Sequence, residues 1–392
     1  MDRNKPVPLW RIMGHLRGLA IIAVVVSHGG YFTMLYYQGL IGTGKLGLDF
    51  AAYRHHHFYL ALLVLVQEFA RCAVPLFIFL TGHFLAQAPH TWKAIWRRSR
   101  PLLTAYLLWS LLAWITKALL GGQSLAGCLV ELVRDPGPFL ELLAMGQAQM
   151  GFYFILLIIQ FFVLARWAVP LMRRRPGLVL GVGLLVQAAS VAWNYGDLFL
   201  CPPYLKQDIA VPGLLFSHWT LFFALGLWVG LHPGRIKSLL AQRSGIILLF
   251  SLLAALSLVA ESRLFLQLFE ERAPNTLFTT HFMKPMVAWK VGTNLWSLGL
   301  IFGGLVLGRL WLPPSDSLVR LGTWAITIFL VHVQILLLLW GLVLKETWFQ
   351  ALFLPWWLIL PFLLAVSLAL PILLARLLRH LAPRAARYVT GN

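Results

Sequence analysis

The chain has 392 residues, of which 60% are hydrophobic and 11% charged, and its mean hydropathy is +0.79. Soluble domains are about 45–50% apolar and about 25% charged, so this composition excludes an ordinary soluble fold and indicates an all-α, polytopic membrane protein. The formal net charge of +19 would also suit a nucleic-acid-binding protein. In a membrane protein, however, a basic excess more often reflects topology, because Lys and Arg are retained on the cytoplasmic side.

Ten apolar segments follow one another along the chain, each suited to a helix that crosses a hydrocarbon core of ~30 Å. Helices are expected because lipid offers backbone groups no hydrogen-bond partner. The expected spans are residues 17–38, 59–86, 102–120, 152–172, 178–195, 214–231, 245–264, 285–308, 322–343 and 352–377.

The basic residues predict the orientation of these spans. If the N-terminus is cytoplasmic, the basic clusters that include Arg97, Arg173 and Arg235 all fall in inner segments, while the outer segments carry nearly balanced charge. Both termini are therefore expected in the cytoplasm. Topology accounts for the basic excess, so no nucleic-acid partner is expected.

The rest of the sequence indicates no second domain. Without a visible repeat or low-complexity tract, residues 1–392 are expected to form one transmembrane domain, and the first apolar run is expected to be retained because no small-residue cleavage site follows it. Cys128 and Cys201 fall in expected outer loops, where the sequence allows a disulfide between them but does not require one. The longest outer loops are expected at 121–151, 196–213 and 265–284.

The first span contains "LRGLAIIAVVVSH", with Arg17 at its start and His28 at its end. Eleven helical positions make three turns plus about 20°, so both side chains share one face, about 16 Å apart along the axis. Ionisable groups inside a membrane are costly and are site candidates by default. This stripe suits a ligand or reaction path through the inner half of the bilayer, although a snorkelling arginine and a packing histidine would give the same pattern.

The second span carries three ionisable candidates. Glu68 and Arg71 are three positions apart, so they are neighbours on one helical face, and a structural ion pair is the favoured interpretation. His83 follows a proline, Pro75, and is expected near the cytoplasmic end, where contact with lipid headgroups would explain it.

Two later spans contain one further candidate each. Lys290 lies in "MVAWKVGTNLW", where it could extend to the outer interface or serve as the counter-charge of Glu68 or of a substrate. His332 is deep in the ninth span, in "LGTWAITIFLVHVQIL". A lone histidine in that position is more often a packing residue than a chemical one.

Two clusters lie outside the spans. The three histidines of "RHHHFYL" (54–60) point in different directions on a helix, so no metal site is expected. In "WKAIWRRSRP" (92–101), tryptophans alternate with basic residues at the expected cytoplasmic surface. Anionic lipid would explain this segment, and a phosphate-rich cytoplasmic ligand would bind the same charges.

Together these segments resemble acyltransferase family 3, the multi-span bacterial enzymes that O-acylate sugars and cell-surface glycans. Arg17 and His28 match the family's arginine, ten residues and a histidine within "LRGLA…H". The family's "VPLFFFISG" corresponds to "VPLFIFLTG" (74–82), and its basic segment ending in proline corresponds to "RRSRP" (97–101). The aromatic start of the family's fourth span corresponds to "GFYFILLIIQFF". The family's late "SFGIYLIH" corresponds to "TWAITIFLVH", which ends at His332. The chain departs from the family at Gly14 and His15, where an acid is usual, and at Thr323 and Trp324.

The resemblance implies a function. It implies transfer of an acyl group, usually acetyl, from cytoplasmic acyl-CoA to a hydroxyl of an extracytoplasmic or lipid-linked sugar, in the bacterial cytoplasmic membrane and without a tightly bound cofactor. His28 and Arg17 would then be catalytic, and Arg97, Arg98 and Arg100 would bind the acyl-CoA phosphates. A transporter or flippase remains the alternative, because ten spans with proline-broken helices and a few buried charges are also typical of carriers.

Overall fold

A computed structural model describes residues 8–42, 62–200, 215–272, 290–311, 316–350, 352 and 354–390. No strand occurs among these residues. The helices are α1 (Leu9–Gly42), α3 (Ala73–Leu85), α4 (Trp92–Leu120), α5 (Leu125–Arg134), α6 (Gly137–Ala144), α7 (Tyr153–Arg174), α8 (Pro176–Leu200), a 3₁₀ turn at Phe216–Trp219, α9 (Thr220–Leu231), α10 (Pro233–Gln242), α11 (Ser244–Arg272), α12 (Val291–Trp311), α13 (Ser317–Thr323), α14 (Ala325–Leu339), a π-helical turn at Trp340–Leu344, α15 (Thr347–Gln350), α16 (Trp356–Leu381) and α17 (Pro383–Thr390).

The predicted all-α, polytopic membrane fold is confirmed. In the described part of the chain, nine helices are long and apolar enough to cross a membrane, and they coincide with nine of the ten expected spans. The exception is the expected span at 214–231, where the apolar helical segment Phe216–Leu231 is shorter. Its 16 residues extend about 24 Å, less than the ~30 Å of a hydrocarbon core.

The contacts divide the chain into two compact units. The first comprises the described parts of Met1–Val24, Glu68–Thr91 and Gln160–Thr323, and the second those of Val25–Gln67, Trp92–Ile159 and Trp324–Asn392. Helix α1 is continuous and contributes to both units.

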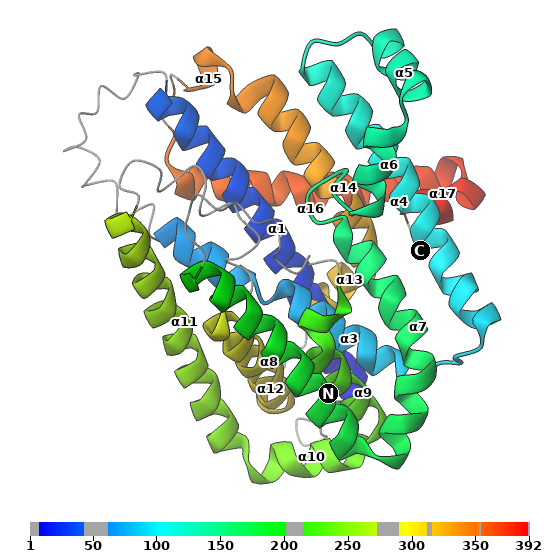
Figure 1. Cartoon of the computed structure of the whole chain (residues 1–392), viewed down its shortest axis with the longest axis vertical. Coiled ribbons are helices and arrows are strands. Elements are labelled where there is room, and N and C mark those ends of the chain that lie inside the picture. Colours follow the sequence, from blue (N-terminus) through cyan, green and yellow to red (C-terminus); the bar gives the residue numbers. More distant parts are fainter. Residues whose placement is uncertain are drawn as a thin grey trace. The chain divides into compact units, whose positions relative to one another are not determined.

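Close helix pairs form the first unit. Helix α3 packs against α9, and α11 runs alongside α12 (Figure 1). Gly82 of α3 and Gly226 of α9 make the first pairing possible, because a Cβ at either position would collide with the backbone of the other helix. Small residues at such contacts are the usual means by which membrane helices approach closely.

The second unit is built around α14 and α16, which pack against each other. Its apolar core includes Phe32 and Tyr36 of α1 with Val333 and Leu336 of α14. Helix α4 belongs to the same unit, and the indole Nε1 of Trp109 donates a 2.8 Å hydrogen bond to the carbonyl of Val389. The core therefore joins segments that are about 300 positions apart in the sequence.

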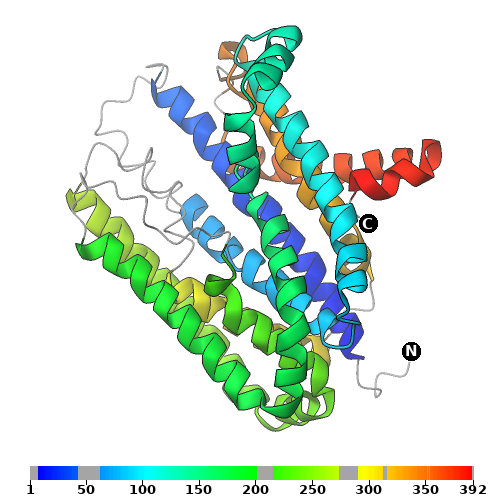
Figure 2. The ribbon, with the colours of Figure 1, turned by 45° about the vertical axis from the view of Figure 1, so that its right-hand side comes forward.

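The expected loop at 121–151 contains two short helices, α5 and α6. They lie at the C-terminal end of α4 (Figures 1 and 2). The Ser124 hydroxyl caps α5 by accepting a 3.0 Å hydrogen bond from the backbone N–H of Gly127. This segment is therefore partly helical, with a capped N-terminus at α5.

Candidate active site

Helix α1 positions both Arg17 and His28. The segment from Leu9 to Gly42 has no proline and no acidic residue, so nothing in it interrupts the helical ladder. Arg17 is half-buried and packs close to α13, since a Cβ at Gly322 would lie 3.3 Å from the Cβ of Arg17. Among the described residues the guanidinium of Arg17 has no hydrogen-bond or ion-pair partner, so its charge is available to a ligand.

His28 lies directly against His332 of α14. Nδ1 of His28 and Nε2 of His332 are 2.7 Å apart, and the two rings are nearly parallel, with an interplanar angle of 4° and centroids 5.0 Å apart. The structure thus brings together two candidates that are 304 positions apart and that the sequence analysis treated separately.

The surroundings of His332 determine which nitrogens carry the protons. Its Nδ1 is 2.7 Å from the carbonyl oxygen of Ile328, which can only accept, so Nδ1 of His332 is the donor. In a neutral imidazole Nε2 is then an acceptor, and it accepts from Nδ1 of His28. His28 consequently presents Nε2, with its lone pair, as a base or nucleophile.

A glycine leaves room beside this ring. Gly151, just before α7, has a φ of +84°, a conformation that L side chains rarely adopt, and a Cβ there would lie 3.0 Å from Cε1 of His28. Phe329 packs between this region and the pair, with its ring centroid 5.1 Å from that of Phe154 and 6.2 Å from that of His332. The sequence analysis did not identify Gly151, because its positive φ depends on how the chain enters α7.

Three arginines occupy the first turns of α4, in the same unit as the histidine pair. Arg97 and Arg100 are exposed, and the guanidinium of Arg100 lies 5.7 Å from the ring centroid of Tyr388. Arg98 is half-buried, and its Nη1 is buried without a hydrogen-bond partner in the described part of the chain. A buried, unpaired guanidinium nitrogen is a ready donor for a phosphate or carboxylate.

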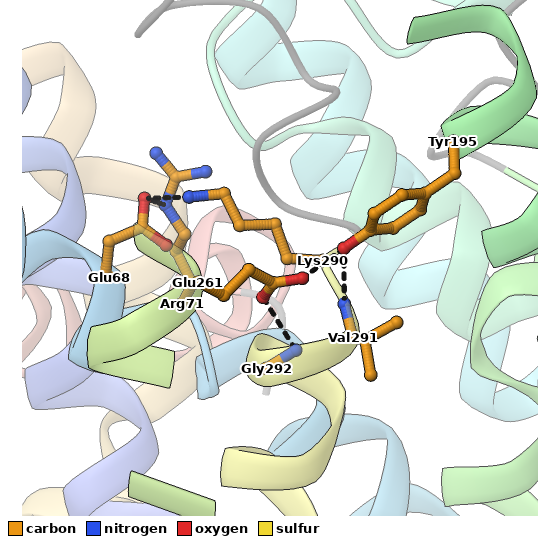
Figure 3. A network of polar contacts seen from close by, with 7 residues as sticks. All are labelled: Glu68, Arg71, Tyr195, Glu261, Lys290, Val291 and Gly292. Carbon is orange, nitrogen blue, oxygen red and sulfur yellow. Dashed lines mark hydrogen bonds and ion pairs between the residues drawn. The ribbon is translucent and has the colours of Figure 1, made fainter. Parts of the chain in front are cut away.

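The remaining charged candidates form a buried cluster in the first unit (Figure 3). Oε1 of Glu68 lies 3.3 Å from Nε of Arg71 and 3.4 Å from Nζ of Lys290. Glu68 and Lys290 are almost fully buried, at 0% and 4% exposure. Both pairings considered from the sequence are present, and the cluster carries two cations around one carboxylate.

A second acid, which the sequence analysis did not identify, lies beside this cluster (Figure 3). Glu261 of α11 accepts a hydrogen bond from the Tyr195 hydroxyl and a 2.7 Å hydrogen bond from the backbone N–H of Gly292. The Tyr195 oxygen in turn accepts a 3.0 Å bond from the N–H of Val291. A carboxylate at the start of α12 accepts from free backbone N–H groups and interacts favourably with the helix dipole. The contacts of Glu261 therefore have a structural explanation.

The other sequence candidates stay apart from these groups. His83 of α3 is half-buried, with its ring against Phe84 at a centroid distance of 5.3 Å. Within the described residues, no group of three or more His, Cys, Asp or Glu side chains could hold a metal ion. The histidines at 55–57 and Cys201 lie outside the described residues, and Cys128 is a buried free thiol.

Among the comparisons with known proteins, only the one with family models gives a match. A family model with the description "Acyltransferase domain" matches residues 11–376, which include every candidate residue named above. No curated protein and no solved structure matches the chain.

Proposed function

The chain belongs to acyltransferase family 3 and is a membrane acyltransferase, and from that premise we propose that it moves an acyl group from acyl-CoA to a hydroxyl of a sugar. We propose acetyl as the group, acetyl-CoA as the cytoplasmic donor and an extracytoplasmic or lipid-linked glycan as the acceptor. The observation that supports the proposal most directly is the histidine pair, because it leaves Nε2 of His28 free to act on a substrate.

His28 can promote the reaction by either of two routes. As a general base, Nε2 takes the proton of the acceptor hydroxyl while the hydroxyl oxygen attacks the thioester carbonyl carbon; the C–S bond breaks, and the departing CoA thiolate receives the proton. As a nucleophile, Nε2 itself displaces the thiolate, and the acceptor oxygen then displaces Nε2 from the acyl group while its proton passes to solvent. In both routes His332 holds the His28 ring in the reactive tautomer.

The arginines support the proposed donor site. Coenzyme A carries several phosphate charges, and Arg98 offers a buried guanidinium nitrogen that has no partner in the described residues. Arg97 and Arg100 add exposed charge in the same turns of α4. The distribution of Lys and Arg supports a cytoplasmic location for these groups and for both termini. We propose a bacterial cytoplasmic membrane because the family resemblance implies it.

Transfer of labelled acetyl tests this proposal. Membranes that contain the wild-type protein are incubated with acetyl-labelled acetyl-CoA, and label that mild base releases from glycan as acetate is measured. We expect His28→Ala to reduce transfer at least about 100-fold, since removal of a positioned acid–base group costs roughly 100- to 10,000-fold.

The matched control is His232→Ala. His232 lies between α9 and α10, where Nδ1 donates to the carbonyl of Trp228, so this variant removes an imidazole of the first unit that the proposal does not use. Equal transfer by wild type and His28→Ala, at equal expression, would contradict the role of His28. Lack of transfer by the wild type would contradict the proposed donor.

A further inference from the structure

A pocket of about 340 Å³ opens at the C-terminal end of α4. Helices α4, α5 and α6 and the segment before α7 form its walls, so the whole pocket belongs to the second unit. Small-molecule sites commonly measure ~300–1,000 Å³, so this volume suits one small ring rather than a long polymer. The lining side chains that carry the argument are Trp114, Lys117, Gln123, Glu131 and Leu142.

These side chains combine an aromatic surface with groups that bind hydroxyls. Glu131 and Gln123 are exposed at the pocket and share a 3.3 Å hydrogen bond from Nε2 of Gln123 to Oε2 of Glu131. The Trp114 ring packs edge-on against Phe139, and its Nε1 is buried without a hydrogen-bond partner among the described residues. A carboxylate, an amide and an indole N–H beside apolar surface are suited to a polyol, whose ring has apolar faces and a rim of hydroxyls.

Lys117 connects two parts of the pocket wall, α4 and the segment before α7. Its Nζ donates a 2.7 Å hydrogen bond to the carbonyl of Ala148, which also lines the pocket. The next residue, Gln149, is 2% exposed, and neither atom of its amide has a hydrogen-bond partner in the part of the chain that is described. Two positions further, a Cβ at Gly151 would lie 3.0 Å from Cε1 of His28, so this glycine is beside that ring. A residue of the pocket wall and a residue beside the His28 ring are therefore only three positions apart in the sequence.

A second connection runs through α14. Thr116, next to Lys117, accepts a hydrogen bond from Nε2 of Gln334. Gln334 is only two residues beyond His332, and its Oε1 is buried without a partner among the described residues. Buried polar groups are normally paired, because an unsatisfied one costs about 1–3 kcal/mol. The amides of Gln149 and Gln334 thus offer polar atoms, unpaired among the described residues, on two segments that adjoin, in sequence, a pocket residue or the histidine pair.

Helix α4 also separates the pocket from the basic segment. Arg98 and Lys117 are nineteen positions apart, which corresponds to about 28 Å along a helix and nearly spans a hydrocarbon core. If the arginines bind a cytoplasmic donor, the pocket opens at the opposite membrane surface. That is where an extracytoplasmic acceptor would arrive.

From these observations we propose that the pocket lined by Trp114, Gln123 and Glu131 binds one sugar unit of the acceptor glycan. Glu131 and Gln123 hold hydroxyls at the mouth, and the hydroxyl to be acylated points inward past Gln149 and Gln334 toward His28. This inference rests on the proposed function for the direction of transfer, but the pocket's affinity for a sugar can be measured without any transfer.

The test measures sugar binding to the full-length protein in lipid nanodiscs without acyl-CoA. Methyl glycosides of glucose, galactose, mannose and rhamnose are the probes, and saturation-transfer NMR is the readout. We expect at least one glycoside to bind the wild type, and Glu131→Gln to weaken that binding at least about tenfold, because hydrogen bonds to a charged group are the stronger ones. Glu141→Gln is the matched control, since it removes an exposed carboxylate of α6 that does not line the pocket.

Each outcome decides one of the two proposals. Lack of binding by the wild type, or equal binding by wild type and Glu131→Gln, overturns the pocket assignment. The same proteins are then given labelled acetyl-CoA with the bound glycoside. Binding without transfer leaves the pocket assignment standing and contradicts the proposed function. Transfer at the wild-type rate by Glu131→Gln shows that the sugar is acylated from another site and overturns the inference.

Discussion

The imidazole of His332 acts on His28 through one hydrogen bond, and its own tautomer is set by the Ile328 carbonyl four residues earlier. His332 is almost fully buried, so its ring has little freedom to turn away. We propose that it positions and polarises His28, in the way that an outer partner orients a metal-binding or catalytic histidine. The contribution of His332 to the rate can be measured separately from that of His28.

We expect His332→Phe to lower kcat about 10- to 100-fold with little change in the KM for acetyl-CoA, because loss of an orienting partner typically has an effect of that size. His332→Gln should recover part of the lost rate, since its amide oxygen can accept the proton of Nδ1 of His28. Steady-state kinetics of both variants in nanodiscs give the answer. A fall in expression and kcat that is equal in both variants would indicate a purely structural role.

At the scale of elements, the entry into α7 controls the space beside the reactive ring. Gly151 and Gly122 both have a strongly positive φ, +84° and +89°. A Cβ at Gly151 would press on Cε1 of His28, whereas a Cβ at Gly122 would meet nothing within 4 Å. The two positions therefore share the backbone strain and differ in the crowding of the site.

This difference gives a paired prediction for Gly151→Ala and Gly122→Ala. Each should lower stability by about 1–2 kcal/mol, because a non-glycine residue in a left-handed conformation costs that amount. Only Gly151→Ala should also reduce acetyl transfer, at least about fivefold, since it displaces the His28 ring. Thermal unfolding and transfer are measured side by side. Equal activity of the two variants would show that crowding at Gly151 does not reach the reaction.

At the scale of the whole molecule, the positions of the helices were largely predictable from the sequence. A stretch of apolar residues identifies a span without reference to its neighbours, and nine of the ten expected spans coincide with helices long enough to cross a membrane. The helices α5 and α6 were not predicted, because a short amphipathic helix in a loop lacks that signal. The site residues were recognisable singly, since an ionisable group in a span is conspicuous.

What the sequence could not predict is which of those residues meet. The contact between His28 and His332 depends on the packing of α1 against α14, across 304 positions. The pairing of Lys290 with Glu68 was one of three open alternatives, and the structure shows their contact at 3.4 Å. Gln149 and Gln334 were not identified as site candidates, because only the structure shows that their buried amides have atoms without hydrogen-bond partners among the described residues.

The proposed topology is a prediction for the whole chain. Lys93→Cys, at the start of α4, should lie in the cytoplasm, and Val133→Cys, an exposed position of α5, should lie outside. In intact cells that express a background without native cysteines, an impermeant maleimide should label only Val133→Cys, and permeabilisation should expose Lys93→Cys. The reverse pattern would place both termini outside.

The hydrogen bond from His332 to the Ile328 carbonyl has a consequence for engineering. A main-chain atom fixes the tautomer of His332, and His332 in turn fixes that of His28, so no side chain of α4 or α5 takes part in this arrangement. Side chains on α4 and α5 can therefore be exchanged without altering the proton arrangement at His28, provided α14 keeps its helical form. In the proposed mechanism the catalytic pair and the proposed sugar pocket are separate parts, so we expect that acceptor preference can be redesigned on this chain without changing the chemistry.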